Sequence, residues 1–204
     1  MEQSRNYQKE LDRLLAGLDV ADGQVPHLLL HACCAPCSSY VLEYLSAYFR
    51  ITVLYYNPNI YPEEEYRQRA EELKKLVDRM PFAHPVSFVE GSYDPEVFFS
   101  MARGLEDIPE GGERCFACYR LRMEEAARSA VKLGCDYFTT TLSISPLKSA
   151  KKINEIGEAL GEIYHIRHLP SDFKKKNGYK RSLELSKEYE LYRQNYCGCI
   201  YSRR

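Results

Sequence analysis

The chain lacks any apolar run long enough to cross a membrane, since no stretch approaches the roughly 20 apolar residues that a spanning helix requires. It also lacks an N-terminal basic segment followed by an apolar core, which is the pattern of a secretory signal peptide. Internal repeats and low-complexity linkers are absent from the sequence. We therefore expect no membrane partner, a cytoplasmic location, and one domain covering all 204 residues.

The formal net charge is only −1, but its distribution is uneven. Residues 146–204 hold 13 Lys and Arg against 7 Asp and Glu, a net of +6, whereas residues 1–145 hold 15 against 22, a net of −7. A basic third of this kind can attract a polyanion such as a nucleic acid. A solvated helical face would give the same pattern, so charge alone leaves both interpretations open.

Apolar periodicity predicts strands that alternate with helices along the chain. The expected strands cover residues 27–31, 51–56, 86–89, 137–142 and 163–166, and the main helices cover 41–49, 62–80, 95–103, 115–134, 149–160 and 181–195. Leu11, Leu14, Leu15 and Leu18 predict a further helix inside an N-terminal extension, residues 1–25. This order predicts an α/β protein with a mostly parallel five-stranded sheet and flanking helices.

Polar and sulfur-containing side chains follow the ends of four expected strands. These side chains are Cys33, Cys34 and Cys37 after the first strand, Asn57 and Asn59 after the second, Ser143, Ser145 and Lys148 after the fourth, and Asp172–Lys176 after the fifth. Sites in open parallel sheets lie at the carboxyl ends of the strands. We therefore expect these residues to meet in one crevice.

Seven of the eight cysteines form three groups: Cys33-Cys34-x-x-Cys37, Cys115-x-x-Cys118 and Cys197-x-Cys199. In a chain without a secretory signal, such spacing points to metal or redox chemistry rather than structural disulfides. Zinc and an iron–sulfur cluster are both compatible with thiolate ligands. The adjacent Cys33 and Cys34 favour the cluster, because each thiolate can occupy a separate iron corner. The isolated Cys135 is expected to be a buried structural residue.

The Cys197-Gly198-Cys199 string predicts a redox pair. A disulfide across one glycine closes a small, strained ring, and strained disulfides are easily reduced. Further metal ligation by both thiols is the alternative. Cys37 is compatible with a spare ligand, a nucleophile, or a thiol with a lowered pKa at a helix N-terminus. The Cys-x3-Cys-x2-Cys spacing of radical adenosylmethionine enzymes is absent.

Basic residues in the last third of the chain are interleaved with aromatic ones. They are Lys148, Lys151, Lys152, Lys174, Lys175, Lys176, Lys180 and Arg181, with Phe173 and Tyr179 among them. Such a mixture can hold phosphates and stack an exposed base. Solvated helix ends remain the alternative.

Five strings together resemble those of the QueH-type epoxyqueuosine reductases: His31-Ala-Cys-Cys-Ala-Pro-Cys37, Asn57-Pro-Asn-Ile60, Cys115-Phe-Ala-Cys-Tyr-Arg-Leu-Arg122, Thr140-Thr-Leu-Ser-Ile-Ser-Pro146 and Tyr196-Cys-Gly-Cys199. The resemblance implies reduction of the epoxide of epoxyqueuosine, at the wobble position of tRNA, to the cyclopentene of queuosine. It implies a fold similar to the nucleotide α-hydrolase and pyrophosphatase group. The Ser-Gly-Gly-x-Asp-Ser phosphate loop of that group is absent, which argues against use of ATP.

The resemblance also implies roles for individual residues. Cys33, Cys34, Cys115 and Cys118 would bind a [4Fe-4S] cluster, and Cys197 with Cys199 would be the redox pair. A second mononuclear iron or other metal near the spare thiols, with Asp172, is an open alternative. We expect the epoxide oxygen to meet a cluster iron as Lewis acid. Its proton would come from Asp172, Tyr179 or Lys148.

The expected partners are the anticodon loop of tRNA bearing epoxyqueuosine and an unidentified electron donor. The residues predicted to bind the substrate are Asn57, Asn59, Ser143, Ser145, Lys148, Lys174, Lys175 and Tyr179. A cluster-dependent tRNA sulfur transferase and an iron–sulfur carrier or zinc-stabilised RNA-binding module are the rival functions. The first of these rivals predicts ATP consumption, and the second predicts metal binding without turnover.

Overall fold

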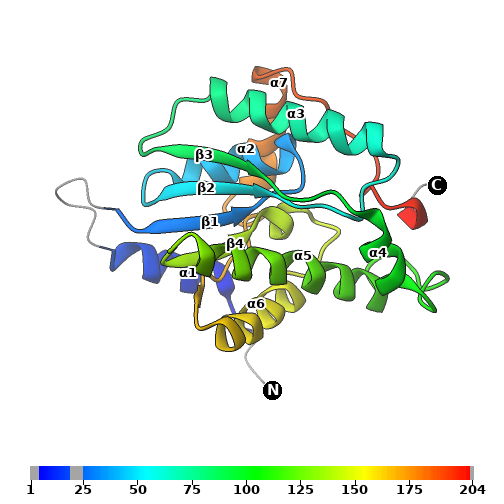
Figure 1. The fold of residues 1–204 in the computed structure, drawn as a ribbon. Helices are drawn as coiled ribbons and strands as arrows, with labels where there is room; N and C mark the ends of the chain where they lie inside the picture. Colours follow the sequence, from blue (N-terminus) through cyan, green and yellow to red (C-terminus); the bar gives the residue numbers. More distant parts are fainter. Residues whose placement is uncertain (1–4, 19–24, 203–204) are drawn as a thin grey trace.

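The five strands form one parallel sheet with the order β3-β2-β1-β4-β5 (Figure 1). The computed structural model describes residues 5–18 and 25–202. Its strands are β1 (His27–His31), β2 (Arg50–Tyr55), β3 (Val86–Glu90), β4 (Tyr137–Thr140) and β5 (Arg167–His168). The prediction of a parallel α/β sheet is thereby confirmed. Similarity to the α-hydrolase group and a single domain over residues 1–204 remain predictions.

Helices cover both faces of the sheet (Figure 1). One layer holds α2 (Ala35–Leu45), α3 (Glu63–Arg79) and α7 (Gly178–Glu188), and the other holds α5 (Glu113–Lys132) and α6 (Ala150–Tyr164), with α4 (Pro95–Ala102) beside α5. Two short 3-10 helices complete the described chain. The first, η2 (Thr141–Ile144), follows β4, and the second, η3 (Ile200–Ser202), is the last element. None of the helices in the described ranges is long and apolar enough to span a membrane.

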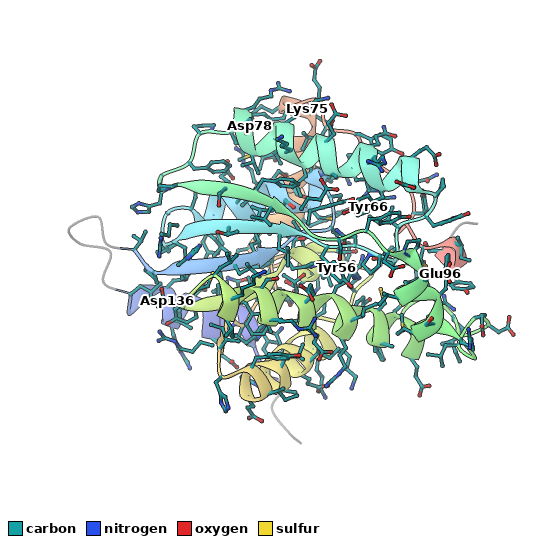
Figure 2. All side chains as sticks on the ribbon, in the orientation of Figure 1. Tyr56, Tyr66, Lys75, Asp78, Glu96 and Asp136 are labelled. Atoms are coloured by element: carbon teal, nitrogen blue, oxygen red, sulfur yellow. The ribbon has the colours of Figure 1, made fainter. Side chains whose placement is uncertain are left out.

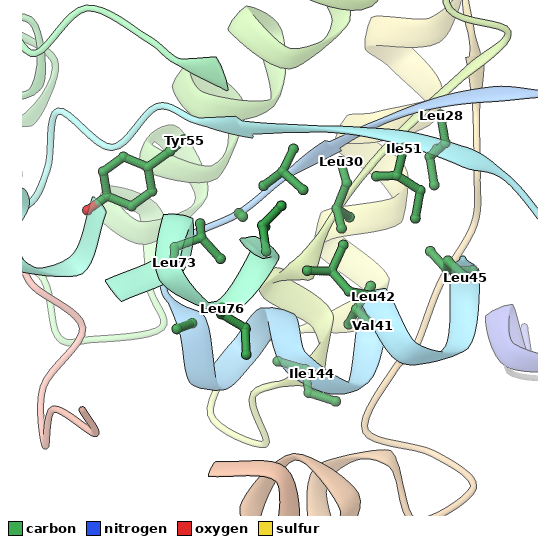
Figure 3. Close-up of a cluster of buried hydrophobic side chains, with 14 of the residues drawn as sticks. Leu28, Leu30, Val41, Leu42, Leu45, Ile51, Tyr55, Leu73, Leu76 and Ile144 are labelled. Carbon is green, nitrogen blue, oxygen red and sulfur yellow. The ribbon is translucent and has the colours of Figure 1, made fainter. Parts of the chain in front are cut away.

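Alternation along the strands divides the core into two layers. In β1, Leu28 and Leu30 pack with α2 and α3, whereas Leu29 packs with α5 and α6, because successive side chains of a strand point to opposite faces. Figure 3 shows Leu30 and Ile51 facing Val41 and Leu42 of α2 in the first layer. Each such leucine is fully buried and contributes about 1.5–3 kcal/mol relative to its exposed state.

The fifth strand and the last helix differ from the sequence prediction. Residues 163 and 164, expected in a strand, belong to the last turn of α6, and β5 begins three residues later at Arg167. Tyr164 continues the apolar face of α6 and packs in the second core layer, so the helical period prevails over β-propensity. His165 then ends the helix in the left-handed conformation at φ 54°. The last helix begins at Gly178 and ends at Glu188, not at 195.

The predicted N-terminal helix is α1 (Tyr7–Ala16), capped by the side chain of Asn6. Leu11 and Leu15 are buried in the first core layer, with Leu14 and Leu18 partly buried against it. The remainder of the predicted 1–25 extension includes residues 1–4 and 19–24, which lie outside the described residues.

The two ends of the sheet carry different residues. Figure 2 shows Asp136, beside the start of β1, at one end, and Glu96 of α4 at the other. Cys135 lies near Asp136, and its Sγ is 3.5 Å from Nδ1 of His27. This supports the expectation that Cys135 is a buried structural residue, because the other cysteines lie at the carboxyl ends of the strands.

Candidate metal and redox site

A cavity of about 890 Å³ opens at the carboxyl ends of β1 and β4. Its walls hold the thiols of Cys33, Cys34, Cys37 and Cys197, and the cations Arg69, Arg122, Lys148 and Arg193. A smaller hollow beside it is lined by Cys115, Cys118, Cys197 and Cys199. Cys197 and Arg122 line both hollows, so the three cysteine groups meet in one region.

The first cysteine group lies where β1 turns into α2. Cys34 is the N-cap residue of α2, with extended backbone, and Pro36 follows in the first turn, where a proline costs no hydrogen bond. The Sγ atoms of Cys33, Cys34 and Cys37 lie within 4.8 Å of one another. Hydrogen bonds from the neighbouring thiols of Cys34 and Cys37 hold the pKa of Cys33 well below its usual range. This triad can hold a metal.

The second group begins α5, where Cys115 and Cys118 lie one turn apart on the same helix face. Cys118 is buried, and burial raises the pKa of its thiol to about 12 in the protein without metal. The backbone N–H of Gly111 donates to Sγ of Cys115 at 3.3 Å. All eight cysteines are free thiols.

The third group lies in a tight turn of the C-terminal segment. Gly198 has φ 116°, which residues with a side chain rarely adopt, so glycine is required between the two thiols. The Nη1 of Arg69 donates to the carbonyl of Cys197 at 3.1 Å, and the N–H of Tyr61 donates to the carbonyl of Gly198 at 3.0 Å. These bonds fix the turn against α3 and the loop that precedes it.

Three buried arginines, Arg69, Arg114 and Arg122, lie among the thiols, and Arg69 and Arg122 line the large cavity. Arg69 of α3 is 2% exposed and pairs with Glu65 at 2.7 Å. Arg122 of α5 is 1% exposed; its Nη1 donates to Asn57 Oδ1 and its Nε to the Cys118 carbonyl, both at 3.3 Å. The Nη2 atoms of Arg69 and Arg122 are buried without a hydrogen-bond partner. Such orphaned donors beside thiols fit an anionic sulfur-containing group.

Lys148 completes the positive lining of the large cavity. Burial acts to lower its pKa, but the neighbouring thiols of Cys197, Cys33 and Cys37 outweigh that effect and raise it above the usual range. Its ammonium group is therefore kept protonated at the cavity wall.

The residues predicted to bind substrate divide into three sets. Ser145, Lys148 and Tyr179 line the large cavity, and Asn59 lines the smaller hollow with its amide buried and unpaired. Asn57 and Ser143 are fully buried and engaged in internal hydrogen bonds. Lys174 and Lys175 are not among the described residues that line either hollow, and neither is Asp172, which was predicted as a catalytic residue. Direct contact of these last two sets with substrate stays a prediction.

The basic stretch is largely neutralised in the folded chain. Lys174 pairs with Asp172 at 2.5 Å, Lys176 with Asp12 at 3.0 Å, and Arg181 with Glu43 at 2.6 Å. Lys151 and Lys152 both pair with Glu155. Phe173, expected to be available for stacking, is 1% exposed in the core, whereas Tyr179 is 37% exposed at the cavity. Only part of the predicted basic surface is therefore free.

Sequence reasoning missed the buried Arg69 and Arg122, and it missed Glu110, a carboxylate that lines both hollows. Arg122 carries a local signal, because it follows Cys118 by four residues and so shares its helix face. Arg69 carries no such signal, because its partner carbonyl, Cys197, lies 128 residues away.

A parallel α/β sheet with a thiol-lined crevice at its carboxyl ends defines a class of metal- or thiol-dependent enzymes. Comparison with known families narrows this class. The family model for epoxyqueuosine reductase QueH matches residues 28–204, so the chain belongs to the QueH family of oxidoreductases.

Curated relatives agree with this assignment. An epoxyqueuosine reductase QueH of Staphylococcus epidermidis is 43% identical over 204 residues, covering 98% of this chain and 85% of the relative. The epoxyqueuosine reductase QueH of Streptococcus pyogenes is 46% identical over 181 residues, which cover 88% of this chain and 71% of the relative. The epoxyqueuosine reductase QueH of Thermotoga maritima is 35% identical over 181 residues, which cover 86% of this chain and 89% of the relative.

Proposed function

We propose that this chain reduces epoxyqueuosine at the wobble position of tRNA to queuosine. The observation that carries the proposal is the meeting of three cysteine groups, from distant parts of a QueH-family chain, around one crevice. The cavity of about 890 Å³ is in the range of small-molecule sites, so one modified nucleoside fits. Thiols for electron transfer and cations for an anionic transition state line the same space.

The proposed cofactor is a [4Fe-4S] cluster on Cys33, Cys34, Cys115 and Cys118. Four thiolates are the usual complement of such a cluster. Arg122 supports this assignment, because it lines the two hollows that hold these four thiols and its Nη2 has no hydrogen-bond partner among the described residues. When bound, the cluster would supply electrons and a Lewis-acidic iron. Cys37, within 4.8 Å of Cys33 and Cys34, is the thiol that a second iron or other metal would use.

The proposed redox pair, Cys197 and Cys199, balances the reaction. Converting an epoxide to an alkene and water takes two electrons and two protons, and oxidation of two thiols to a disulfide releases the same number of each. Cys197 lines the large cavity, whereas Cys199 is 7% exposed behind it. An external electron donor, still unidentified, would reduce the disulfide and the cluster.

Lys148 and Tyr179 are the proposed groups for protons and orientation, because both line the large cavity. A protonated Lys148 can donate a hydrogen bond to the epoxide oxygen and stabilise negative charge as the carbon–oxygen bond breaks. Asp172 was an alternative proton donor, but its carboxylate is held by Lys174.

The anticodon loop would reach Lys175 and Lys180, for which the described structure shows no ion pair. We place this reaction in the cytoplasm, where thiols remain reduced.

An anaerobic assay tests the proposal. Iron-reconstituted protein is incubated with dithionite and tRNA bearing epoxyqueuosine, and the nucleosides are identified by mass after digestion. Loss of one oxygen is expected. No conversion by protein with a full cluster would contradict the proposal, and ATP dependence would then be measured to test sulfur transfer.

Three variants separate the roles of the cysteines. Cys115→Ser should lose the cluster absorbance and turnover together. Cys199→Ser should keep the absorbance but lose multiple turnover, because one thiol cannot close a disulfide. Cys135→Ser, at the opposite end of the sheet, is the matched control and should keep both. Full activity in Cys115→Ser rules out its ligand role, and unchanged turnover in Cys199→Ser rules out the redox pair.

A further inference from the structure

Arg122 is a buried charge that has no counter-charge from a carboxylate. It is 1% exposed, and no ion pair to it exists within residues 5–18 and 25–202. Its three hydrogen-bonding nitrogens meet a neutral amide, Asn57, a neutral carbonyl, Cys118, and, at Nη2, no partner. A buried, unpaired charge is strongly unfavourable, so a protein retains one where a ligand supplies the opposite charge.

The other two buried arginines show the contrast. Arg69 is 2% exposed, but its Nε pairs with Glu65 at 2.7 Å, so its charge is compensated inside the protein. Arg114, on the first turn of α5, is bound by the carbonyls of Leu105 and Glu106 and orders the loop before the helix. Within the described chain, Arg122 has no carboxylate partner, a single carbonyl accepts from it, and its Nη2 stays unpaired.

The groups that surround Arg122 are sulfur atoms from all three cysteine groups. Cys33 lines the large cavity with Arg122, Cys118 lines the smaller hollow with it, and Cys197 lines both. Its side chain lines both hollows. Glu110 lines them as well without pairing to Arg122, and Lys148 adds a second positive charge on the large cavity. The compensating negative charge would therefore come from the thiolates together with the centre that they bind.

We propose that Arg122 is the fixed counter-charge of the metal centre, and that it sets the reduction potential of the bound cluster. The proposal rests on the cluster proposed above. A [4Fe-4S] centre with four thiolates is an anion, and accepting one electron adds one unit of negative charge. A buried guanidinium stabilises the reduced form more than the oxidised form, because the interaction grows with the charge. Its orphaned Nη2 would also donate to a sulfur of the bound cluster, which would act in the same direction.

A structural role for Arg122 makes a different prediction. If it only braced Asn57 against α5, replacement would lower stability and leave the potential of the loaded centre unchanged. The counter-charge role predicts a changed potential and, without metal, no loss of stability, because an uncompensated buried charge has been removed.

The test is a redox titration of iron-reconstituted wild type, Arg122→Gln and Arg122→Lys. The matched control is Arg128→Gln, an exposed arginine of α5 that pairs with Glu125. We expect Arg122→Gln to have a more negative potential, with the reduced-to-oxidised ratio at a given potential falling at least tenfold, or 59 mV for one electron. Arg122→Lys keeps the charge and should restore most of the shift, and Arg128→Gln should titrate like wild type.

Each outcome decides between the two roles. An unchanged potential in a fully loaded Arg122→Gln overturns the proposal. If Arg122→Gln fails to bind iron, urea unfolding of the metal-free proteins decides: equal or greater stability than wild type supports the counter-charge role, and lower stability overturns it. Failure of wild-type protein to bind a cluster would instead refute the proposed cofactor.

Discussion

Replacing Gly198 by alanine should disconnect the proposed redox pair from the cavity. Gly198 has φ 116°, and an added Cβ would lie 2.9 Å from Cγ1 of Ile60 and 3.0 Å from Nη1 of Arg69. The backbone strain costs roughly 1–3 kcal/mol. The overpacking costs about 1–3 kcal/mol more if the turn stays in place.

The segment can avoid part of this cost by leaving its position. Release breaks the bond from Arg69 to the Cys197 carbonyl, worth about 1.5–3 kcal/mol, and the bond from Tyr61 to the Gly198 carbonyl, worth about 1 kcal/mol. The free energy of unfolding should therefore fall by no more than about 3–4 kcal/mol. Turnover should fall by about 100-fold or more, because a shift of about 1 Å in a reacting group has that effect.

Urea unfolding of the reduced, metal-free protein measures the stability, and the tRNA assay measures turnover. Gly134→Ala is the control, because Gly134 also has positive φ, 63°, but no atom lies within 4 Å of an added Cβ. It should lose about 1–2 kcal/mol and keep its activity. If Gly198→Ala matches this control in both stability and turnover, the required geometry of the turn has been misjudged.

Two further predictions concern the scaffold. In Leu30→Ala, at a fully buried position in Figure 3, the free energy of unfolding in urea should fall by about 2–5 kcal/mol. In Leu147→Ala, a control at a 77% exposed position, it should change by no more than about 0.5 kcal/mol. Equal losses would contradict the assigned core. Burial, with the charge of Arg5, lowers the pKa of His168 to about 3, so its neutral form stabilises the fold above pH 6.5, and that contribution is lost as the pH falls toward 3. By pH 5 the loss should reach about 2 kcal/mol, and His168→Leu should remove this part of the pH dependence; an unchanged slope would refute it.

Most of the fold could be predicted from local sequence, because strands β1 to β4 combine β-branched or apolar runs with clear breaks. The exception, β5, has two residues, and no period can be read from so short an element. The first two residues of the expected strand, 163 and 164, belong to the end of α6. Ile153, Leu160 and Tyr164 form a helical face that packs in the second core layer, and that packing outweighs local propensity.

The position of the site could also be predicted, because the carboxyl ends of parallel strands share one edge. The roles of single residues could not. Asn57 and Ser143 follow strands as predicted, but burial commits their side chains to Ala32 and Ser171. The hydrogen bond from Arg69 to the Cys197 carbonyl forms only because the segment after α7 folds back beside α3. No local sequence pattern encodes that contact.

The charge distribution has a different meaning in the folded chain than in the sequence. The acidic and basic parts meet in space, where Asp12 of α1 and Glu43 of α2 bind Lys176 and Arg181. Exposed pairs of this kind add little stability, but they remove cations from the surface that would attract a polyanion. Two further cations without an ion pair among the described residues, Arg122 and Lys148, line the cavity that holds the thiols. Charges that line a low-dielectric cavity act most strongly on a group that enters it, so Arg122 and Lys148 would act on the reacting group of the proposed substrate.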